Sequence, residues 1–154
     1  MTSISHDARH RMHPLDEAID LKLAAPGECM GATHPAYANM VGPFGGTTAA
    51  QLLQAAWLHP DRLGEPVALT VNFAAPVADG QILFLVRAAR TNRSTQHWII
   101  EARQGDETVA TATAVFALRR ETWSAGEARM PQGLPPADAL ERMQLKGLMP
   151  WPQL

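Results

Sequence analysis

Residues 47–58 read TTAAQLLQAAWL, and this stretch decides the fold. The segment His59-Pro60 ends it, because the residue before a proline avoids helical dihedral angles. Between these bounds the apolar residues recur with the spacing of one helical face: Ala49, Leu52, Leu53, Ala56 and Trp57. We therefore predict a helix over 47–58 with an apolar stripe that other elements must cover.

The sequence after this helix has the alternation and turn residues of β-strands. The run 81–90 is apolar on both faces, which predicts a central strand. A lone apolar helix has only the sheet to pack against, so we expect an α+β domain with one long central helix wrapped by an antiparallel β-sheet. Four meandering strands are predicted, over 67–74, 81–90, 96–103 and 108–118.

The sequence before the helix contains less regular patterns. Residues 18–23 are short and apolar before Pro26-Gly27, which predicts a first strand that ends in a turn. Two prolines and three glycines within 34–46 favour a loop. His6, His10 and His13 have a spacing that would place three imidazoles on one side of a helix, but we interpret the region as a mobile arm without a metal site.

A length of 154 residues is suited to a single domain. We expect a flexible arm over 1–15, the domain over 16–120, and a proline-rich linker or docking tail over 121–154 with a short helical candidate at 136–146. The apolar tail residues Leu148, Met149 and Trp151 would need a surface to cover them.

Composition excludes several classes of partner. A formal net charge of −2 provides no basic field for nucleic acid. Cys29 is the single cysteine, so no disulfide framework can form and a reducing compartment is expected. No run approaches the ~20 apolar residues of a membrane span. We expect a cytoplasmic protein without cofactors.

Three motifs occur in order between Tyr37 and Phe116. Phe44-Gly45-Gly46 opens the predicted helix, and Gln51 follows five residues after the second glycine. Residues 72–76 supply Phe73 and Pro76 of a His-x-x-Phe-x-x-Pro strand, and residues 90–94 are similar to an Arg-Asp-Gly-x-Ser hairpin. This combination resembles the N-terminal half of the acyl-CoA thioesterase II family. The resemblance implies a hot-dog fold and hydrolysis of fatty acyl-CoA thioesters.

The sequence departs from that family where catalysis is concerned. The family's catalytic Asp, Thr and Gln belong mainly to a second hot-dog half, which this sequence does not reach, so those roles cannot be carried over. Single-domain hot-dog thioesterases instead have an acidic residue seven positions after the second glycine. Leu53 occupies that position here.

Candidate site residues surround the start of the helix. Gly45 and Gly46 would expose amides that can hold an oxyanion with the helix dipole, or they only allow close packing. Gln51 is predicted to lie off the core-facing stripe, where it orients water or serves an interface. The catalytic candidates are Gln51 and Asn39. The substrate-binding candidates are Tyr37, Gly45, Gly46, Thr47 and Ser94.

Two other reactive residues are given structural interpretations. His97 is predicted to be packed or surface-exposed on a strand, and Cys29 to be a packed thiol.

Three hypotheses for function remain open. The first is an acyl-CoA thioesterase that acts as a homodimer or higher oligomer, because a lone hot-dog domain leaves surfaces unpaired. The second is a non-catalytic subunit that binds acyl thioesters or completes a partner's site, which suits the missing acid. The third is a hydratase or dehydratase, for which His34 is the loop candidate without an acid at useful spacing.

Overall fold

The computed structural model describes residues 12–133 and residue 135. The chain divides into two units, Met1–Arg120 and Glu121–Leu154. In the second unit, residues 121–133 and 135 are exposed and form no helix or strand. Most of the predicted arm, with His6 and His10, lies outside the described residues, as do the helical candidate 136–146 and the apolar tail residues.

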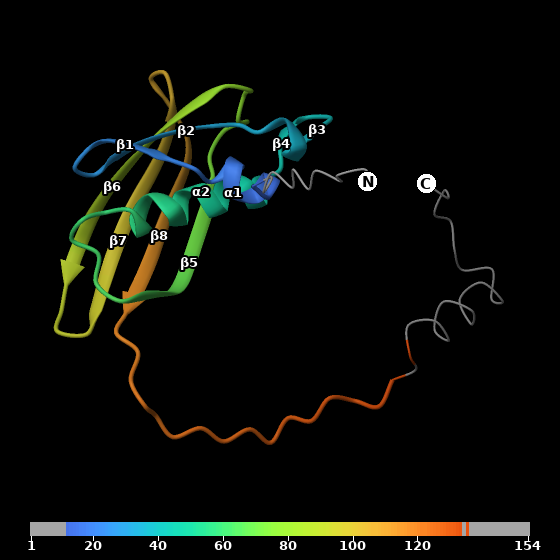
Figure 1. Cartoon of the computed structure of the whole chain (residues 1–154), viewed down its shortest axis with the longest axis vertical. Coiled ribbons are helices and arrows are strands. Elements are labelled where there is room, and N and C mark those ends of the chain that lie inside the picture. Colours follow the sequence, from blue (N-terminus) through green and yellow to red (C-terminus); the bar gives the residue numbers. More distant parts are fainter. Residues whose placement is uncertain (1–11, 134, 136–154) are drawn as a thin grey trace, which may run out of the picture. The chain divides into compact units, whose positions relative to one another are not determined.

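A six-stranded antiparallel sheet forms the body of the first unit (Figure 1). The strand order is β1-β2-β6-β7-β8-β5, so β5 and β1 are the edges. The six strands are β1 (Lys22–Ala25), β2 (Glu28–Ala32), β5 (Glu65–Phe73), β6 (Gln81–Thr91), β7 (Thr95–Gln104) and β8 (Glu107–Ala117). The four predicted strands are therefore present, and β6 is central as expected.

The connection of β5 differs from a simple meander. Strands β6, β7 and β8 pair in sequence order, but β5 crosses over and pairs with β8, with Phe73 opposite Ala110 and Glu65 opposite Ala117. The chain between β5 and β6 passes through residues 74–80, too many for a tight hairpin. As a result β5 becomes the open edge of the sheet.

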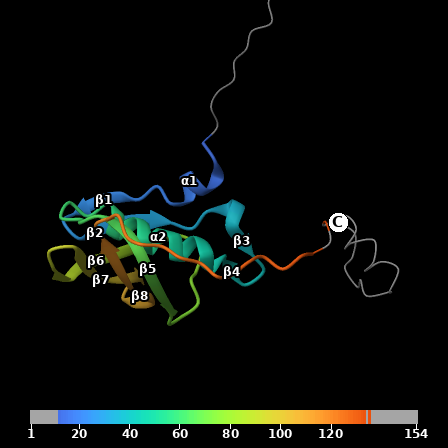
Figure 2. The same cartoon turned by 90° about the horizontal axis from the view of Figure 1, so that it is seen from below.

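The central helix is α2 (Gly45–Trp57), which begins two residues before the predicted start. It lies against the sheet, which bends around it (Figures 1 and 2). The buried face differs from the predicted stripe: Thr48, Gln51, Leu52, Ala55 and Ala56 are buried, whereas Ala49, Leu53 and Trp57 are only half-buried. The buried face is shifted by about one residue from the predicted stripe, because the polar residues Thr48 and Gln51 are buried with it.

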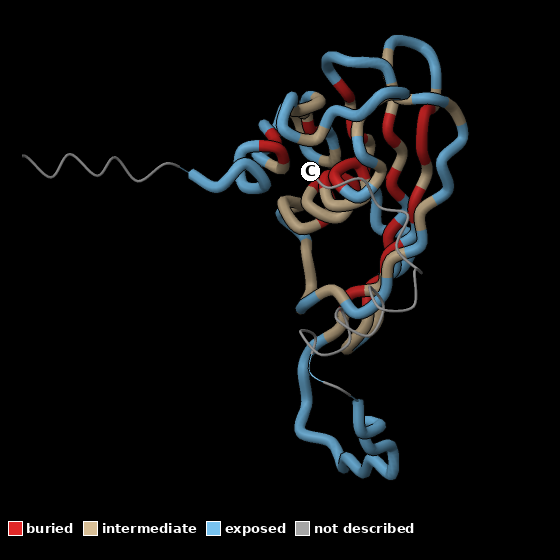
Figure 3. Tube along the Cα trace, turned by 90° about the vertical axis from the view of Figure 1, so that its right-hand side faces the viewer, coloured by how far each residue is buried: buried red, intermediate tan, exposed pale blue. Residues whose placement is uncertain are grey.

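The core lies between α2 and the inner face of β6, β7 and β8, where buried positions alternate along each strand (Figure 3). Phe84, Trp98 and Phe116 are its largest side chains, each exposed by no more than 1%. Ala110, Ala112 and Ala114 on β8 are also buried. Burial of aromatic side chains of this size is a dominant favourable contribution to folding.

The N-terminal prediction was wrong in part. A short helix, α1 (Pro14–Ala18), begins with the His13 side chain accepting a hydrogen bond from the Leu15 amide at 3.1 Å, and Pro14 suits the first helical turn. The first strand, β1, therefore starts at Lys22 rather than Ala18. Gly27 makes the predicted turn with a φ of 81°, and β2 follows it.

The predicted loop over 34–46 contains short regular pieces. These are η1 (Pro35–Tyr37), a 3₁₀ turn, and a two-stranded hairpin of β3 (Ala38–Asn39) and β4 (Gly42–Pro43). The backbone oxygen of Tyr37 accepts a hydrogen bond from the Phe44 amide at 2.7 Å. This bond fixes the direction in which the chain enters α2.

Candidate functional site

The first turn of α2 has free backbone donors. Phe44 is the N-cap, and its side chain makes no capping hydrogen bond. Within the described residues, the amides of Gly45 and Gly46 have no hydrogen-bond partner. Such amides, together with the partial positive charge of a helix N-terminus, can hold an anion or a developing oxyanion.

The same two glycines are also packing positions. A Cβ atom at Gly45 would lie 3.0 Å from Cζ of Phe73, and one at Gly46 would overlap the ring of Phe44. The two phenylalanine rings therefore lie directly over the start of the helix. Both proposed reasons for the glycines, close packing and open amides, are compatible with this geometry.

An apolar groove of about 340 Å³ opens at this helix start. Gly45 and Thr48 of α2 line one side, and Phe73 at the end of β5 lines another. The remaining walls come from β4, its preceding loop and the segment after β5: Val41, Gly42, Pro43, Ala75, Pro76 and Val77. Val41 and Phe73 are exposed by 89% and 55%, so this apolar surface is accessible.

A second, more polar cavity of about 250 Å³ shares Gly42 and Pro43 with the groove. Asn39 and Asp79 both line it. Oδ1 of Asn39 accepts a hydrogen bond from the Val41 amide at 3.0 Å, which leaves its Nδ2 group free to donate. The β3–β4 hairpin therefore separates an apolar groove from a polar cavity that contains a carboxylate.

His34 also lines the polar cavity, but its ring is held by other groups. Nδ1 accepts a hydrogen bond from the Ala36 amide at 3.2 Å, and Nε2 lies 3.2 Å from Oε2 of Glu17. The acid missing near His34 in the sequence is thus supplied by α1. Because both ring nitrogens are occupied, His34 has no free nitrogen with which to act as the base of a hydratase.

Gln51 is placed differently from the prediction. Only 2% of the residue is exposed, and its Nε2 donates hydrogen bonds to the backbone oxygens of Ala18 at 2.7 Å and Ala32 at 2.8 Å. The expectation that Gln51 faces away from the core was wrong. Both amide protons are used to join α2 to the N-terminal segment and β2, so these contacts favour a structural role.

The other predicted site residues separate into two groups. Asn39 and Gly45 line the cavities at the start of α2, and Tyr37 and Gly46 lie in the same region. Ser94 lies beside Leu118, at the opposite end of the sheet from Phe73.

Thr47 is buried and turned away from the groove. Its amide and hydroxyl both donate to the Phe44 oxygen, at 3.0 and 2.6 Å, while the neighbouring Thr48 lines the groove.

Sequence reasoning missed the residues that form the cavity walls. Val41, Ala75 and Val77 carry only an apolar signal, which cannot distinguish a groove wall from a core position, and the motif residue Phe73 was given no role at the site. Asp79 lies between the predicted strands 67–74 and 81–90, and its hydrogen bond from the Thr33 hydroxyl joins two segments far apart in sequence. No local pattern indicates that pairing.

The remaining reactive side chains lie away from these cavities. Cys29 is buried on β2, and burial raises the pKa of its thiol, which makes it a poor nucleophile. His97 is exposed on β7, which is one of the two predicted alternatives.

Within residues 12–133 and 135, no three metal-ligating side chains of the His, Cys, Asp or Glu type form a cluster. None of the helices described here has the length and apolar character of a membrane span.

A six-stranded antiparallel sheet bent around one long helix, with an open groove at the start of that helix, defines a hot-dog domain. Residues 34–117 match the family described as the acyl-CoA thioesterase N-terminal domain. Because the match covers more than half of the chain, the protein belongs to this family. No curated protein matches the chain.

Solved structures support the same assignment. A hot-dog protein of unknown function from Alicyclobacillus acidocaldarius is 51% identical, with a TM-score of 0.77, over 82% of this chain and 48% of its own. An acyl-CoA thioesterase II from Mycobacterium marinum is 26% identical, with a TM-score of 0.67, over 80% of this chain and 46% of its own. The chain thus spans about half the length of these relatives.

A shorter protein shares the fold over nearly its whole length. A conserved protein from Pseudomonas aeruginosa is 22% identical, with a TM-score of 0.59, over 69% of this chain and 94% of its own. At this level of identity the similarity shows the fold alone.

Proposed function

We propose that this domain binds fatty acyl-CoA thioesters at the start of α2 and hydrolyses them when a second hot-dog domain pairs with it. The observation that carries the proposal is the juxtaposition of two unpartnered glycine amides with an accessible apolar groove. The groove suits an alkyl chain, and the amides suit the oxygen of the thioester carbonyl. A binding site usually combines such apolar walls with a few directed polar groups.

The proposed reaction uses the helix start as an oxyanion hole. The amides of Gly45 and Gly46 donate to the carbonyl oxygen, which gains negative charge as water attacks the carbonyl carbon. The Nδ2 group of Asn39 is free to donate from the adjacent polar cavity, since its Oδ1 is held by the Val41 amide, and we include it as a further donor to the substrate. The carbon–sulfur bond then breaks, and the thiol of CoA leaves with a proton.

The attacking water also needs a base. Asp79 is the carboxylate that lines the cavity next to the groove, and we propose it as the base within this chain. Its side chain accepts a hydrogen bond from the Thr33 hydroxyl, which fixes its orientation. Leu53, at the position of the helix acid in single-domain relatives, is half-buried against the core and cannot serve this role.

We further propose that a second copy of this domain pairs along β5. An edge strand presents a row of unpaired backbone groups, and β5 also exposes Val67 and Phe73, by 60% and 55%. Pairing about a two-fold axis would bring the Phe73 end of one β5 beside the Glu65 end of the other. The family name of an N-terminal domain, and relatives about twice as long, support the presence of a second hot-dog domain in the proposal.

A second function is favoured by one observation. The residues that line the apolar groove include no carboxylate, histidine or cysteine. A domain that binds the acyl thioester while its partner supplies the base would have this composition. In that case the isolated chain binds acyl-CoA without hydrolysing it.

An assay of thiol release distinguishes the hydrolytic function from the binding function. It is run with acyl-CoA substrates of about 4 to 16 carbons, for the wild type and for Asp79→Asn. The asparagine retains the acceptor for Thr33 and removes the charge. A loss of about 10²-fold or more supports Asp79 as the base. Equal activity of the wild type and Asp79→Asn assigns the base to another group. Binding of acyl-CoA by the wild type without hydrolysis supports the second function. Asp106→Asn, in the exposed β7–β8 turn, is the matched control.

A further inference from the structure

A cavity of about 360 Å³ at the opposite end of the sheet is lined by three arginines. Arg93 is in the turn between β6 and β7, and Arg119 and Arg120 follow β8. Ser94 and Leu118 complete the lining, and the Leu118 amide donates to the Ser94 oxygen at 3.0 Å. This bond holds the turn and the end of β8 side by side, so the arginines share one opening.

The three guanidinium groups have no carboxylate partner in the described part of the chain. The ion pairs recorded for residues 12–133 and 135 involve other side chains, Glu17 with His34 and Glu101 with Arg103. Glu65 lies opposite Ala117 in the strand register and Glu121 follows Arg120 in the sequence, and neither is in an ion pair recorded for the described residues. The cavity therefore has a local excess of positive charge in a chain whose formal net charge is −2.

Nearby residues hold the turn that carries Arg93. The Asn92 amide donates to the Thr95 oxygen at 2.8 Å, and Oδ1 of Asn92 accepts a hydrogen bond from Nε of Arg90, also at 2.8 Å. The side chain of Arg90 is thus directed by Asn92 and adds a fourth positive charge at this end. A fixed turn lowers the conformational entropy lost when a ligand binds.

We propose that Arg93, Arg119 and Arg120, with Ser94, form an anion site for the phosphate groups of the thioester's pantetheine carrier. The proposal rests on the proposed function, and it accounts for a feature of that site: the residues lining the groove and the polar cavity include no lysine or arginine. Guanidinium groups are well suited to bind phosphate oxygens, because they donate in a fixed planar geometry.

The two ends of the sheet must then come from different copies. Strand β5 has nine residues, so its ends lie about 26 Å apart. The arginine cavity is at the Glu65 end, since Glu65 and Thr95 both lie opposite Ala117. Two-fold pairing along β5 would bring the arginine end of one copy toward the helix start of the other, so each copy contributes the anion site for its partner's thioester.

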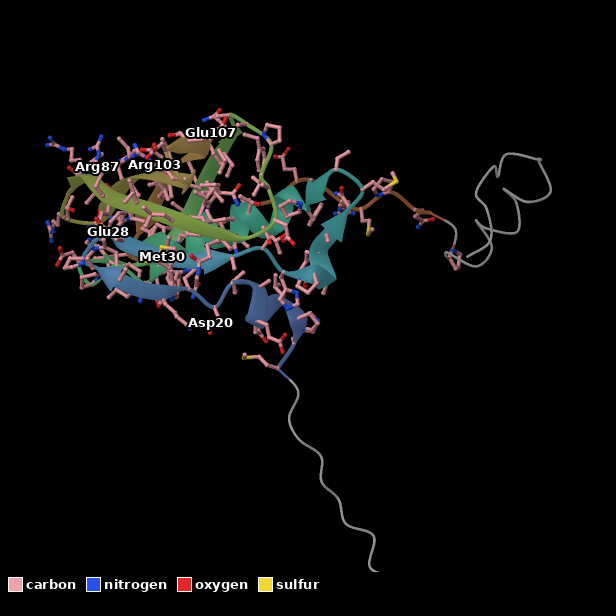
Figure 4. All side chains as sticks on the ribbon, turned by 90° about the horizontal axis from the view of Figure 1, so that it is seen from above. Asp20, Glu28, Met30, Arg87, Arg103 and Glu107 are labelled. Atoms are coloured by element: carbon pink, nitrogen blue, oxygen red, sulfur yellow. The ribbon has the colours of Figure 1, made fainter. Side chains whose placement is uncertain are left out.

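The test is calorimetric binding of CoA to the wild type and to the triple variant Arg93→Gln/Arg119→Gln/Arg120→Gln. We expect the dissociation constant to rise about 30-fold or more, and wild-type affinity to fall as salt is added. All three residues are exposed, so folding should be unaffected. Arg87→Gln is the control, because Arg87 lies on β6, outside the arginine cavity, and its side chain is exposed (Figure 4). A triple arginine-to-lysine variant keeps the charge but loses the planar donors, so its affinity should lie between those of the glutamine variant and the wild type.

Dephospho-CoA and 4′-phosphopantetheine distinguish the source of the phosphate. Arginine-dependent binding of all three compounds indicates the phosphate shared by CoA and carrier proteins, whereas dependence for CoA alone indicates its ribose 3′-phosphate. Unchanged CoA affinity in the triple variant, or no CoA binding by the wild type, overturns the anion site.

Hydrolysis separates this proposal from the proposed function. If octanoyl-CoA and octanoyl-pantetheine are both hydrolysed, the triple variant should raise KM for octanoyl-CoA alone. An equal change in KM for both substrates, or no change for either, overturns the anion site but leaves the proposed thioesterase activity intact. Arginine-dependent binding of CoA without hydrolysis supports the anion site and contradicts the hydrolytic activity.

Discussion

The side-chain nitrogen of Gln51 lies 2.8 Å from the backbone oxygen of Ala32, which joins the middle of α2 to the end of β2. A second hydrogen bond, of 2.7 Å, reaches the oxygen of Ala18 at the end of α1. Gly31 lies beside this hydrogen bond, where a Cβ atom would overlap the Leu21 side chain at 2.5 Å and crowd Phe84 at 3.1 Å. One buried amide therefore holds the N-terminal segment against the helix.

Gln51→Ala should lower the free energy of unfolding by about 2–4 kcal/mol, because two backbone oxygens would lose a buried donor. Urea denaturation measures the change. Gln54→Ala is the control: Gln54 is half-buried on the same helix and makes no side-chain hydrogen bond among the described residues, so its effect should stay within about 0.5 kcal/mol. Equal midpoints for the two variants would show that Gln51 does not hold the fold together.

The proposed oxyanion hole at the start of α2 predicts the effect of replacing Asn39. Asn39→Asp keeps the oxygen that accepts from the Val41 amide, and it removes the Nδ2 donor. Turnover of acyl-CoA should fall roughly 10²-fold while thermal stability stays near that of the wild type, since the turn is retained. Full activity in this variant would restrict Asn39 to a role in the turn.

The open β5 edge predicts self-association. Light scattering at micromolar concentrations should give a dimer or larger species. Val67→Lys should shift it toward the monomer, since a charged side chain would enter an apolar contact. Ile99→Lys is the control, because Ile99 lies on the outer face of β7 and is 36% exposed; this variant should not change the oligomeric state. A stable monomeric wild type would remove the basis for a site shared between two copies.

The pair Glu101 and Arg103 predicts a pH dependence of stability. The hydrogen bond from Nε of Arg103, at 2.7 Å, and that from the Thr108 hydroxyl lower the pKa of Glu101. A carboxylate with a lowered pKa stabilises the fold above its unfolded pKa, and the contribution is lost as pH falls. The Glu101→Gln variant should therefore be less stable than the wild type at neutral pH, and the stabilities of the two proteins should become equal as the pH falls.

Thermal unfolding from pH 7 downward measures this convergence. Glu107→Gln is the matched control, because Glu107 is exposed on β8 and forms no ion pair in the described residues (Figure 4). A stability difference that is constant with pH would contradict the assignment.

Much of the fold could be predicted from local patterns. Apolar and polar residues alternate over 67–118, and this alternation predicts the strand bounds to within a few residues, because a strand with one buried face has a period of two. The pairing of β5 with β8 could not be predicted, since it depends on which partner the crossing chain reaches. Helix α1 was missed because it is a single turn whose signal is a histidine cap.

The candidate site was harder to predict than the fold. The glycine amides followed from the position of Gly45 at a helix start, a local property. Gln51 and Gln96 illustrate the opposite case: both are buried glutamines, and Gln96 exchanges hydrogen bonds with Leu63, Asp61 and Thr91. A polar side chain that satisfies backbone groups from distant segments has the same sequence signature as a solvated one.

The most direct test of the central claim is amide NMR of the chain with a non-hydrolysable thioether analogue of a long-chain acyl-CoA. We predict that the largest shift changes fall on Gly45 and Gly46, with further changes at Val41 and Val77 along the groove. The amides around Ile99 and Glu101, which line a separate cavity, should be unaffected. Changes concentrated at that second cavity, with Gly45 and Gly46 unperturbed, would contradict an acyl thioester site at the start of α2.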